Sequence, residues 1–327
     1  MAASGRIGAH YPGHVLSRLR ANPWVRTAIV LVVLACAGYA LHDRWDEASE
    51  ALAALSPWAV AGSAGAALAG LGAQMLAWRA ILADLGSPLP AGTAARIMFV
   101  GQLGKYLPGS VWAFVAQVEL ARDREVARQR GITATVLAVV VTLTVNLAVA
   151  AATLPFAAEE AARRWWWVLA CAPVLLAALH PRVVTWLVHA ALRLARRSRA
   201  VPDEELERVS GRGMAAAVGW SAAAWIPLTA HVWLLVAGVG GDGAAALPVA
   251  AGAYALAWTL GVVVVLAPAG LGVREVVLVV GLAPVLDPGP ALVVAALSRL
   301  VMTAADLLWA GASLLLPGGR RGPAMTG

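Results

Sequence analysis

Two long apolar stretches of this chain are each interrupted by proline, glycine and charged residues. The interruptions are residues 105–112, KYLPGSVW, and residues 267–275, APAGLGVRE. Lipid cannot hydrogen-bond the backbone groups that such a break frees, so the break must be covered by protein or by a water-filled cavity. One break in each half of the chain predicts a polar site where the two breaks meet, an arrangement typical of transporters.

The composition places the rest of the chain in a membrane. Hydrophobic residues make up 61% of the sequence and charged residues 13%, whereas soluble domains average about 25% charged residues. Several apolar stretches exceed the ~18 residues that a membrane-spanning helix needs, and the short alternating segments of a β-barrel do not occur. The sequence therefore predicts an all-α, polytopic helical membrane protein.

We expect about eight crossings and one re-entrant element within a single domain, residues 27–316. Arginines flank both ends of residues 97–120, so this segment should enter the membrane and return as two short helices that meet near Pro108-Gly109. Residues 180–213 are predicted to be cytoplasmic and to begin as an amphipathic helix on the inner leaflet. The expected crossings are residues 27–41, 57–80, 133–156, 165–179, 214–239, 246–266, 268–285 and 291–316.

The charge pattern predicts the orientation in the membrane. The net charge is +7, carried almost wholly by arginines that lie between the apolar stretches. By the positive-inside rule, the tails at residues 1–26 and 317–327 are expected in the cytoplasm, with the domain in the plasma membrane. Residues 27–41 are expected to be an uncleaved first helix rather than a signal peptide.

Nucleic acid, metal and cofactor binding are not expected. No zinc or RNA-binding signature accompanies the arginines. The two cysteines, Cys36 and Cys171, lie inside apolar stretches, where they are expected to be buried rather than disulfide-bonded. Signatures of soluble enzymes and of ATP-binding loops are absent, so we expect neither enzymatic activity nor ATP-driven transport by this chain alone.

Five charged residues fall inside apolar stretches, where charge is costly and usually functional. They are Lys105, Arg274, Glu275, Arg299 and Asp306. Arg299 and Asp306 are seven residues apart and therefore share a helix face. Structural roles stay open: Glu275 as a helix cap paired with Arg299, Asp306 as the partner of another arginine, and Lys105 as a snorkelling side chain.

The two breaks have the chemistry of a phosphate site. Gly270 and Gly272 permit a turn before a helix that starts at Val273, and its N-terminus favours an anion. Arg274 adds a bidentate donor, and Lys105 lies near the break at Pro108. The candidate binding residues for the head group of an anionic lipid are Lys105, Tyr106, Pro108, Gly109, Gly270, Gly272, Arg274, Glu275, Arg299 and Asp306.

Other polar and aromatic residues are expected to be structural. Tryptophans are expected to be interfacial anchors or to face lipid. Asn146 and His231 are expected to hydrogen-bond between helices rather than to carry protons.

At residues 104–112, GKYLPGSVW, and residues 268–275, PAGLGVRE, followed by Arg299, the chain resembles the lysylphosphatidylglycerol synthase transmembrane-region family of flippase-like proteins. The resemblance extends from about residue 51 to 316. It implies a stand-alone member without the aminoacyltransferase domain of the bifunctional proteins. Many members carry an acidic residue soon after the first Pro-Gly, whereas the next acid here is Glu119.

Two functions remain open. The first is a lipid translocator that moves an anionic phospholipid or a polyprenyl-linked glycolipid between leaflets. The alternative is a membrane enzyme or scaffold acting on lipid-linked glycans in cell-envelope synthesis, with Glu275 or Asp306 as acid or base. The short external loops favour translocation. Membrane lipids are the expected partners, and a second copy of the chain or envelope-synthesis proteins remain open.

Overall fold

The computed structural model of the chain describes residues 39, 42–106, 112–157, 209–241, 243, 246–263 and 270–316. All the regular structure in these ranges is helical, and four helices are long and apolar enough to cross a membrane: α4, α7, α11 and α14. The elements are α3 (Trp45–Ala54), α4 (Pro57–Asp84), α5 (Ala91–Gln102), the 3-10 turn η1 (Leu103–Tyr106), α6 (Trp112–Arg122), α7 (Arg128–Ala157), α11 (Gly211–Gly238), α12 (Ala246–Val263), α13 (Val273–Leu282) and α14 (Pro288–Leu315).

These helices confirm the predicted fold class. The expected crossing at residues 165–179, nearly all of that at 27–41, most of the segment 180–213 and both tails lie outside the described residues. Exposed side chains on the long helices are largely apolar, as lipid contact requires. Ile226, Leu300 and Leu307 are examples, with exposed fractions of 76%, 65% and 56%.

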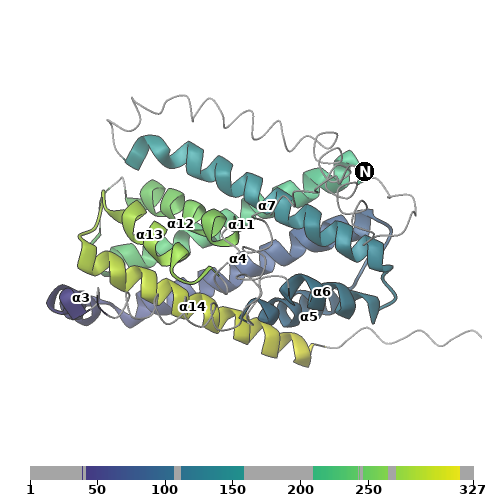
Figure 1. Ribbon diagram of the computed structural model, residues 1–327, viewed down its shortest axis with the longest axis horizontal. Helices are drawn as coiled ribbons and strands as arrows, with labels where there is room; N and C mark the ends of the chain where they lie inside the picture. Colours follow the sequence, from purple (N-terminus) through teal and green to yellow (C-terminus); the bar gives the residue numbers. More distant parts are fainter. Residues whose placement is uncertain are drawn as a thin grey trace, which may run out of the picture.

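The longest interface in the bundle is between α4 and α11 (Figure 1). Small residues bring the two helices together: a Cβ atom on Gly70 would lie 2.6 Å from the side chain of Leu228. Helices α7 and α14 both pack against this pair. Close approach through small residues is how helices associate in lipid, where the hydrophobic effect does not drive them together.

Side-chain caps fix where the long helices begin. At the start of α4, Ser56 Oγ accepts a hydrogen bond from the Trp58 amide at 3.3 Å, and Pro57 occupies the first helical position. At the start of α11, Ser210 Oγ accepts from the Gly213 amide at 3.1 Å. Asp84, the last residue of α4, accepts from the Ser210 amide and hydroxyl at 2.6 and 2.7 Å, which ties the end of one helix to the start of the other.

The first broken segment forms a helical hairpin of α5, η1 and α6. A Cβ atom on Gly101 would lie 3.0 Å from the backbone of Gln117, and one on Gly104 would lie 2.8 Å from the backbone of Ala113. The two arms therefore touch through glycine, as expected for a re-entrant pair. The hairpin starts at Ala91, six residues earlier than the sequence suggested, and the connecting residues 107–111 lie outside the described residues.

The second broken segment forms a hairpin of α12 and α13. Gly270 (φ +68°) lies against the backbone of Gly261, and Gly281 lies against Ala253, so α13 returns along α12. With ten residues, α13 is roughly 15 Å long, about half the thickness of the hydrocarbon layer. The structure thus differs from the two successive crossings expected at residues 246–266 and 268–285. The two hairpins enter the bundle from opposite ends (Figure 1).

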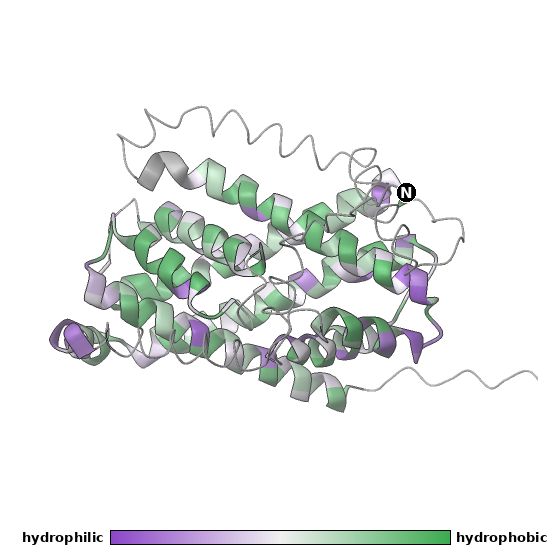
Figure 2. Ribbon diagram, in the orientation of Figure 1, coloured by the Kyte–Doolittle hydropathy of each residue, from purple (hydrophilic) through white to green (hydrophobic). Residues whose placement is uncertain are grey.

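Polar residues gather at the two ends of the bundle (Figure 2). At one end lies the helix α3, whose Ala48 and Ala51 pack against Val293 of α14. Glu47 of α3 accepts from the Gly289 amide, at the N-terminus of α14, at 3.0 Å. Helix α3 was not among the expected elements, because ten residues are too few to give a clear helical pattern.

At the other end, Arg96 of α5 donates to carbonyl groups at the end of α14. The N···O distances to Ser313, Leu314 and Leu316 are 3.2, 2.7 and 3.0 Å. An arginine thereby satisfies carbonyls that a helix C-terminus leaves without intrahelical partners.

Two buried polar residues join helices as predicted. His231 of α11 contacts Ser63 of α4 at 2.7 Å through Nδ1 and Ser298 of α14 at 2.9 Å through Nε2. Asn146 Oδ1 of α7 accepts from Trp225 Nε1 of α11 at 3.0 Å.

Candidate functional site

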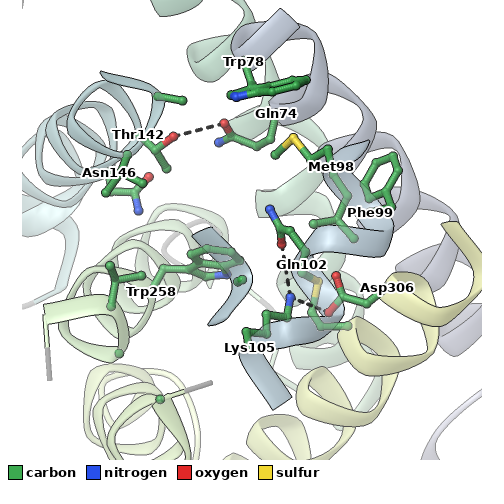
Figure 3. Close-up of a pocket in the computed structure, with 18 of the residues that line it drawn as sticks. Gln74, Trp78, Met98, Phe99, Gln102, Lys105, Thr142, Asn146, Trp258 and Asp306 are labelled. Carbon is green, nitrogen blue, oxygen red and sulfur yellow. Dashed lines mark hydrogen bonds and ion pairs between the residues drawn. The ribbon is translucent and has the colours of Figure 1, made fainter. Parts of the chain in front are cut away.

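A cavity of about 340 Å³ lies where the two hairpins meet, and all four long helices contribute to its lining. Figure 3 shows its wall, with side chains converging from several helices. Six of the predicted binding residues line it: Lys105, Tyr106, Gly270, Arg274, Arg299 and Asp306. Both halves of the chain therefore contribute to one site. Pro108 and Gly109 lie outside the described residues.

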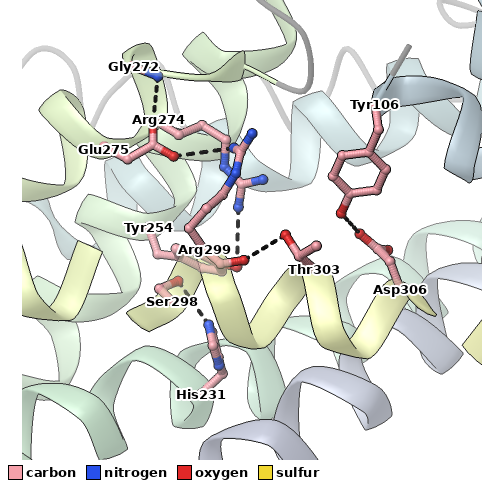
Figure 4. Close-up of polar contacts among 10 residues, drawn as sticks. All are labelled: Tyr106, His231, Tyr254, Gly272, Arg274, Glu275, Ser298, Arg299, Thr303 and Asp306. Atoms are coloured by element: carbon pink, nitrogen blue, oxygen red, sulfur yellow. Dashed lines mark hydrogen bonds and ion pairs between the residues drawn. The ribbon is translucent and has the colours of Figure 1, made fainter. Parts of the chain in front are cut away.

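Lys105 and Asp306 form an ion pair across the cavity wall. The Nζ–Oδ2 distance is 2.6 Å, and Tyr106 Oη donates to the same oxygen at 2.6 Å (Figure 4 shows the Tyr106 bond). Asp306 is 3% exposed. The open alternative that Asp306 pairs with an arginine is not what the structure shows. Instead, the first hairpin neutralises this buried carboxylate of α14.

Glu275 stabilises the second break. Its Oε2 accepts from the Gly272 amide at 2.6 Å, and its Oε1 pairs with Arg299 NH1 at 3.3 Å (Figure 4). Both structural roles considered for Glu275 are therefore present. Because the carboxylate already occupies the Gly272 N–H, the N-terminus of α13 is less open to a phosphate than the sequence suggested, and anion binding depends more on basic side chains.

Arg274 points toward the cavity from the start of α13. Gly261 makes room for it, since a Cβ atom there would lie 2.4 Å from Arg274 Cγ. The guanidinium lies 4.7 Å from the ring centroid of Trp258 and 5.8 Å from that of Tyr254, within the range of cation–π contact. Among the described residues, no carboxylate lies within ion-pair distance of Arg274, so its charge remains available to a ligand.

The sequence did not identify the uncharged part of this wall. It expected tryptophans at interfaces or facing lipid, and Trp58 is indeed 85% exposed. That expectation is wrong for Trp78 and Trp225, which are buried and line the cavity. The sequence signal that could have identified this part of the wall is the presence of polar side chains inside apolar helices. The amides and hydroxyls of the wall are Gln74, Gln102, Gln117, Thr135, Thr142, Asn146 and Thr303.

Glu119 takes no part in the cavity. It pairs with Arg122 at 3.3 Å and with Arg128 at 3.4 Å, near the end of the bundle. Across the described ranges, no group of His, Cys, Asp and Glu side chains could hold a metal ion. The cavity wall carries three cations, two of them in ion pairs with Asp306 and Glu275, together with a set of amides.

A search of the curated proteins finds no match to this chain. The family model for the lysylphosphatidylglycerol synthase TM region matches residues 24–310, which include both hairpins and the cavity. The chain therefore belongs to the lysylphosphatidylglycerol synthase transmembrane-region family, and it is a membrane protein with a lipid-related role.

Proposed function

We propose that this protein is a plasma-membrane lipid translocator that moves an anionic lipid between leaflets, without enzymatic activity of its own. The observation that carries the proposal is the meeting of two oppositely directed hairpins at one cavity that contains Lys105, Arg274 and Arg299. Half-helices that meet within the bundle are typical of transporter sites.

The cavity suits a head group rather than a whole lipid. Its volume of about 340 Å³ is near the lower limit of ligand pockets, which range over roughly 300–1,000 Å³. The phosphate would bind Arg274 and Arg299, because a guanidinium matches phosphate oxygens in a bidentate geometry. The acyl chains would stay in the bilayer.

Purified protein in liposomes tests this proposal. Fluorescent phosphatidylglycerol is expected to change leaflets faster than in protein-free liposomes. The Arg274→Ala variant is expected to lose this acceleration and stay folded, because no described carboxylate is left without its partner. Arg122→Ala is the matched control: it removes an exposed arginine outside the cavity, and transport should continue.

If no anionic lipid moves faster than in protein-free liposomes, with or without a proton gradient, the translocator proposal fails. The alternative hypothesis, a membrane enzyme or scaffold acting on lipid-linked glycans, would then replace it.

A further inference from the structure

The cavity has an uncharged wall in addition to its cations. Gln74 of α4, Gln102 of α5 and Asn146 of α7 face the same space as the charged residues (Figure 3). A phosphate alone would be served by Arg274 and Arg299. The amide wall therefore concerns another part of the ligand.

Hydrogen bonds within the protein orient these amides. Gln74 Oε1 accepts from Thr142 at 3.3 Å and from Ser221 at 3.2 Å. Gln102 Oε1 accepts from Lys105 Nζ at 3.4 Å. Asn146 Oδ1 accepts from Trp225. In each case the oxygen is engaged, so the NH₂ group is the end that a ligand can use, as Figure 3 shows for Gln74 and Gln102.

Three buried polar atoms of the described residues have no hydrogen-bond partner in the protein, and all three belong to side chains of this cavity. They are Asn146 Nδ2, Trp258 Nε1 and Asp306 Oδ1. Asn146 is 1% exposed. Two of these atoms are donors and one is an acceptor. Native proteins rarely leave such atoms unpaired, and a hydroxyl group, which both donates and accepts, complements all three.

A cationic head group fits this wall poorly. The cavity carries Lys105, Arg274 and Arg299. Lys105 pairs with Asp306 and Arg299 with Glu275, so the charge of Arg274 leaves the site with an excess of positive charge. An ammonium group cannot accept from the Asn146 or Trp258 donors, and the excess positive charge repels it. The wall therefore disfavours ethanolamine and lysyl groups.

We infer that the head group carries, beyond its phosphate, an uncharged and hydroxyl-bearing group held by Asn146, Trp258 and Asp306. Glycerol and sugars share this chemistry. The inference rests on the proposed function for its lipid, but it concerns which head group the cavity selects.

Lipid binding in detergent, measured by native mass spectrometry, tests the inference without requiring transport. Phosphatidylglycerol and phosphatidylethanol share one phosphodiester charge and differ in the head-group hydroxyls. With matched acyl chains, phosphatidylglycerol is expected to bind at least about fivefold more tightly, the effect of one or more hydrogen bonds. Phosphatidylethanolamine and lysylphosphatidylglycerol should bind more weakly still. Binding of a polyprenyl-phosphate sugar, measured in the same way, shows whether the cavity prefers a sugar or a glycerol head group.

Two variants localise the effect. Trp258→Phe removes the indole N–H and keeps a ring beside Arg274; it should weaken phosphatidylglycerol binding about fivefold and leave phosphatidylethanol binding unchanged. Asn146→Leu should act in the same direction, although it also leaves the Trp225 N–H unpaired. Trp220→Phe, at an exposed tryptophan of α11 outside the cavity, is the control and should change neither lipid.

Equal binding of phosphatidylglycerol and phosphatidylethanol would overturn the inference. So would tighter binding of a lipid with a cationic head group than of phosphatidylglycerol. An equal loss of binding for both anionic lipids in Trp258→Phe would also overturn it. Selective binding without leaflet exchange in liposomes would leave the inference standing and remove the translocator function. Transport of all anionic lipids without selectivity would do the reverse.

Discussion

The contact between Lys105 and Asp306 joins the two halves of the site at the level of single residues. Asp306 is nearly inaccessible to solvent, and its neutralisation depends on one lysine from the first hairpin. Burying a carboxylate without its partner is strongly unfavourable. The pair therefore couples the position of η1 to that of α14.

Replacing Lys105 with Met should lower the stability of the folded protein by about 3–5 kcal/mol, because Asp306 is left buried with only Tyr106 as a described partner. The double variant Lys105→Met with Asp306→Asn should recover most of this loss, since neither charge remains. Thermal unfolding in detergent measures both effects. Equal melting temperatures for the single and double variants would contradict the dependence of Asp306 on Lys105.

Gly261→Ala should impair transport through Arg274. The new methyl group would overlap Arg274 Cγ, so the guanidinium has to leave its place over Trp258. We expect a transport defect resembling that of Arg274→Ala, and no further loss when both substitutions are combined. Transport rates in liposomes measure this. Additive losses would show that Gly261 acts independently of Arg274.

Sequence reasoning located the charged residues of the site because charge inside an apolar helix is rare. It did not locate Trp258 or the amide wall, since a tryptophan or glutamine in such a helix can face lipid, a neighbouring helix or a cavity. Only tertiary packing decides among these. It also could not pair Lys105 with Asp306, which are 201 residues apart.

At the scale of elements, each hairpin depends on glycine contacts between its two arms. Gly101 and Gly104 serve the first hairpin, and Gly261 and Gly270 the second. The breaks were evident in the sequence from proline and glycine inside apolar stretches. The sequence did not reveal that α13 is too short to cross, because an apolar stretch such as residues 268–285 is also typical of a crossing helix.

Gly104→Ala should destabilise the protein by about 1–3 kcal/mol, the usual effect of overpacking, because its methyl group would meet the backbone of Trp112 and Ala113. Gly65→Ala on α4 is the matched control. A Cβ atom there meets nothing within 4 Å, so alanine should be neutral or raise stability by up to about 1 kcal/mol. Melting temperatures in detergent provide the comparison. Similar behaviour of the two variants would refute the close contact in the hairpin.

At the scale of the whole molecule, polar contacts between helices lie at the two ends of the bundle. The contact of Glu47 with Gly289 lies at one end, together with the turn at Gly241, which packs near Leu286. The contact of Asp84 with Ser210 marks the opposite end. Residues 122–130, an arginine-rich segment predicted to be cytoplasmic, lie at this second end, where Arg130 donates to the Gly86 carbonyl.

Cysteine labelling in intact cells should confirm this orientation. In a background with Cys36 and Cys171 replaced by alanine, cysteines at Glu50 and Ala283 should react with an impermeant maleimide. Cysteines at Asp123 and Arg212 should react only after permeabilisation. These four positions are at the two ends of the bundle. If the cysteine at position 50 does not react with the maleimide in intact cells, the orientation is the reverse of the one predicted or the topology is wrong.

Helix α14 is fastened at both of its ends, by Glu47 at its first turn and by Arg96 at its last carbonyls. This has a mechanical consequence for any cycle that opens the cavity to one leaflet and then the other. A shift of α14 along its axis would break both attachments together, so α14 is expected to act as the stationary frame. Because Arg96 belongs to α5, the outer end of the first hairpin is held to this frame. Movement is then expected at the tip of the hairpin, where the distance from Lys105 to Asp306 changes while Arg299 and Asp306 keep their spacing.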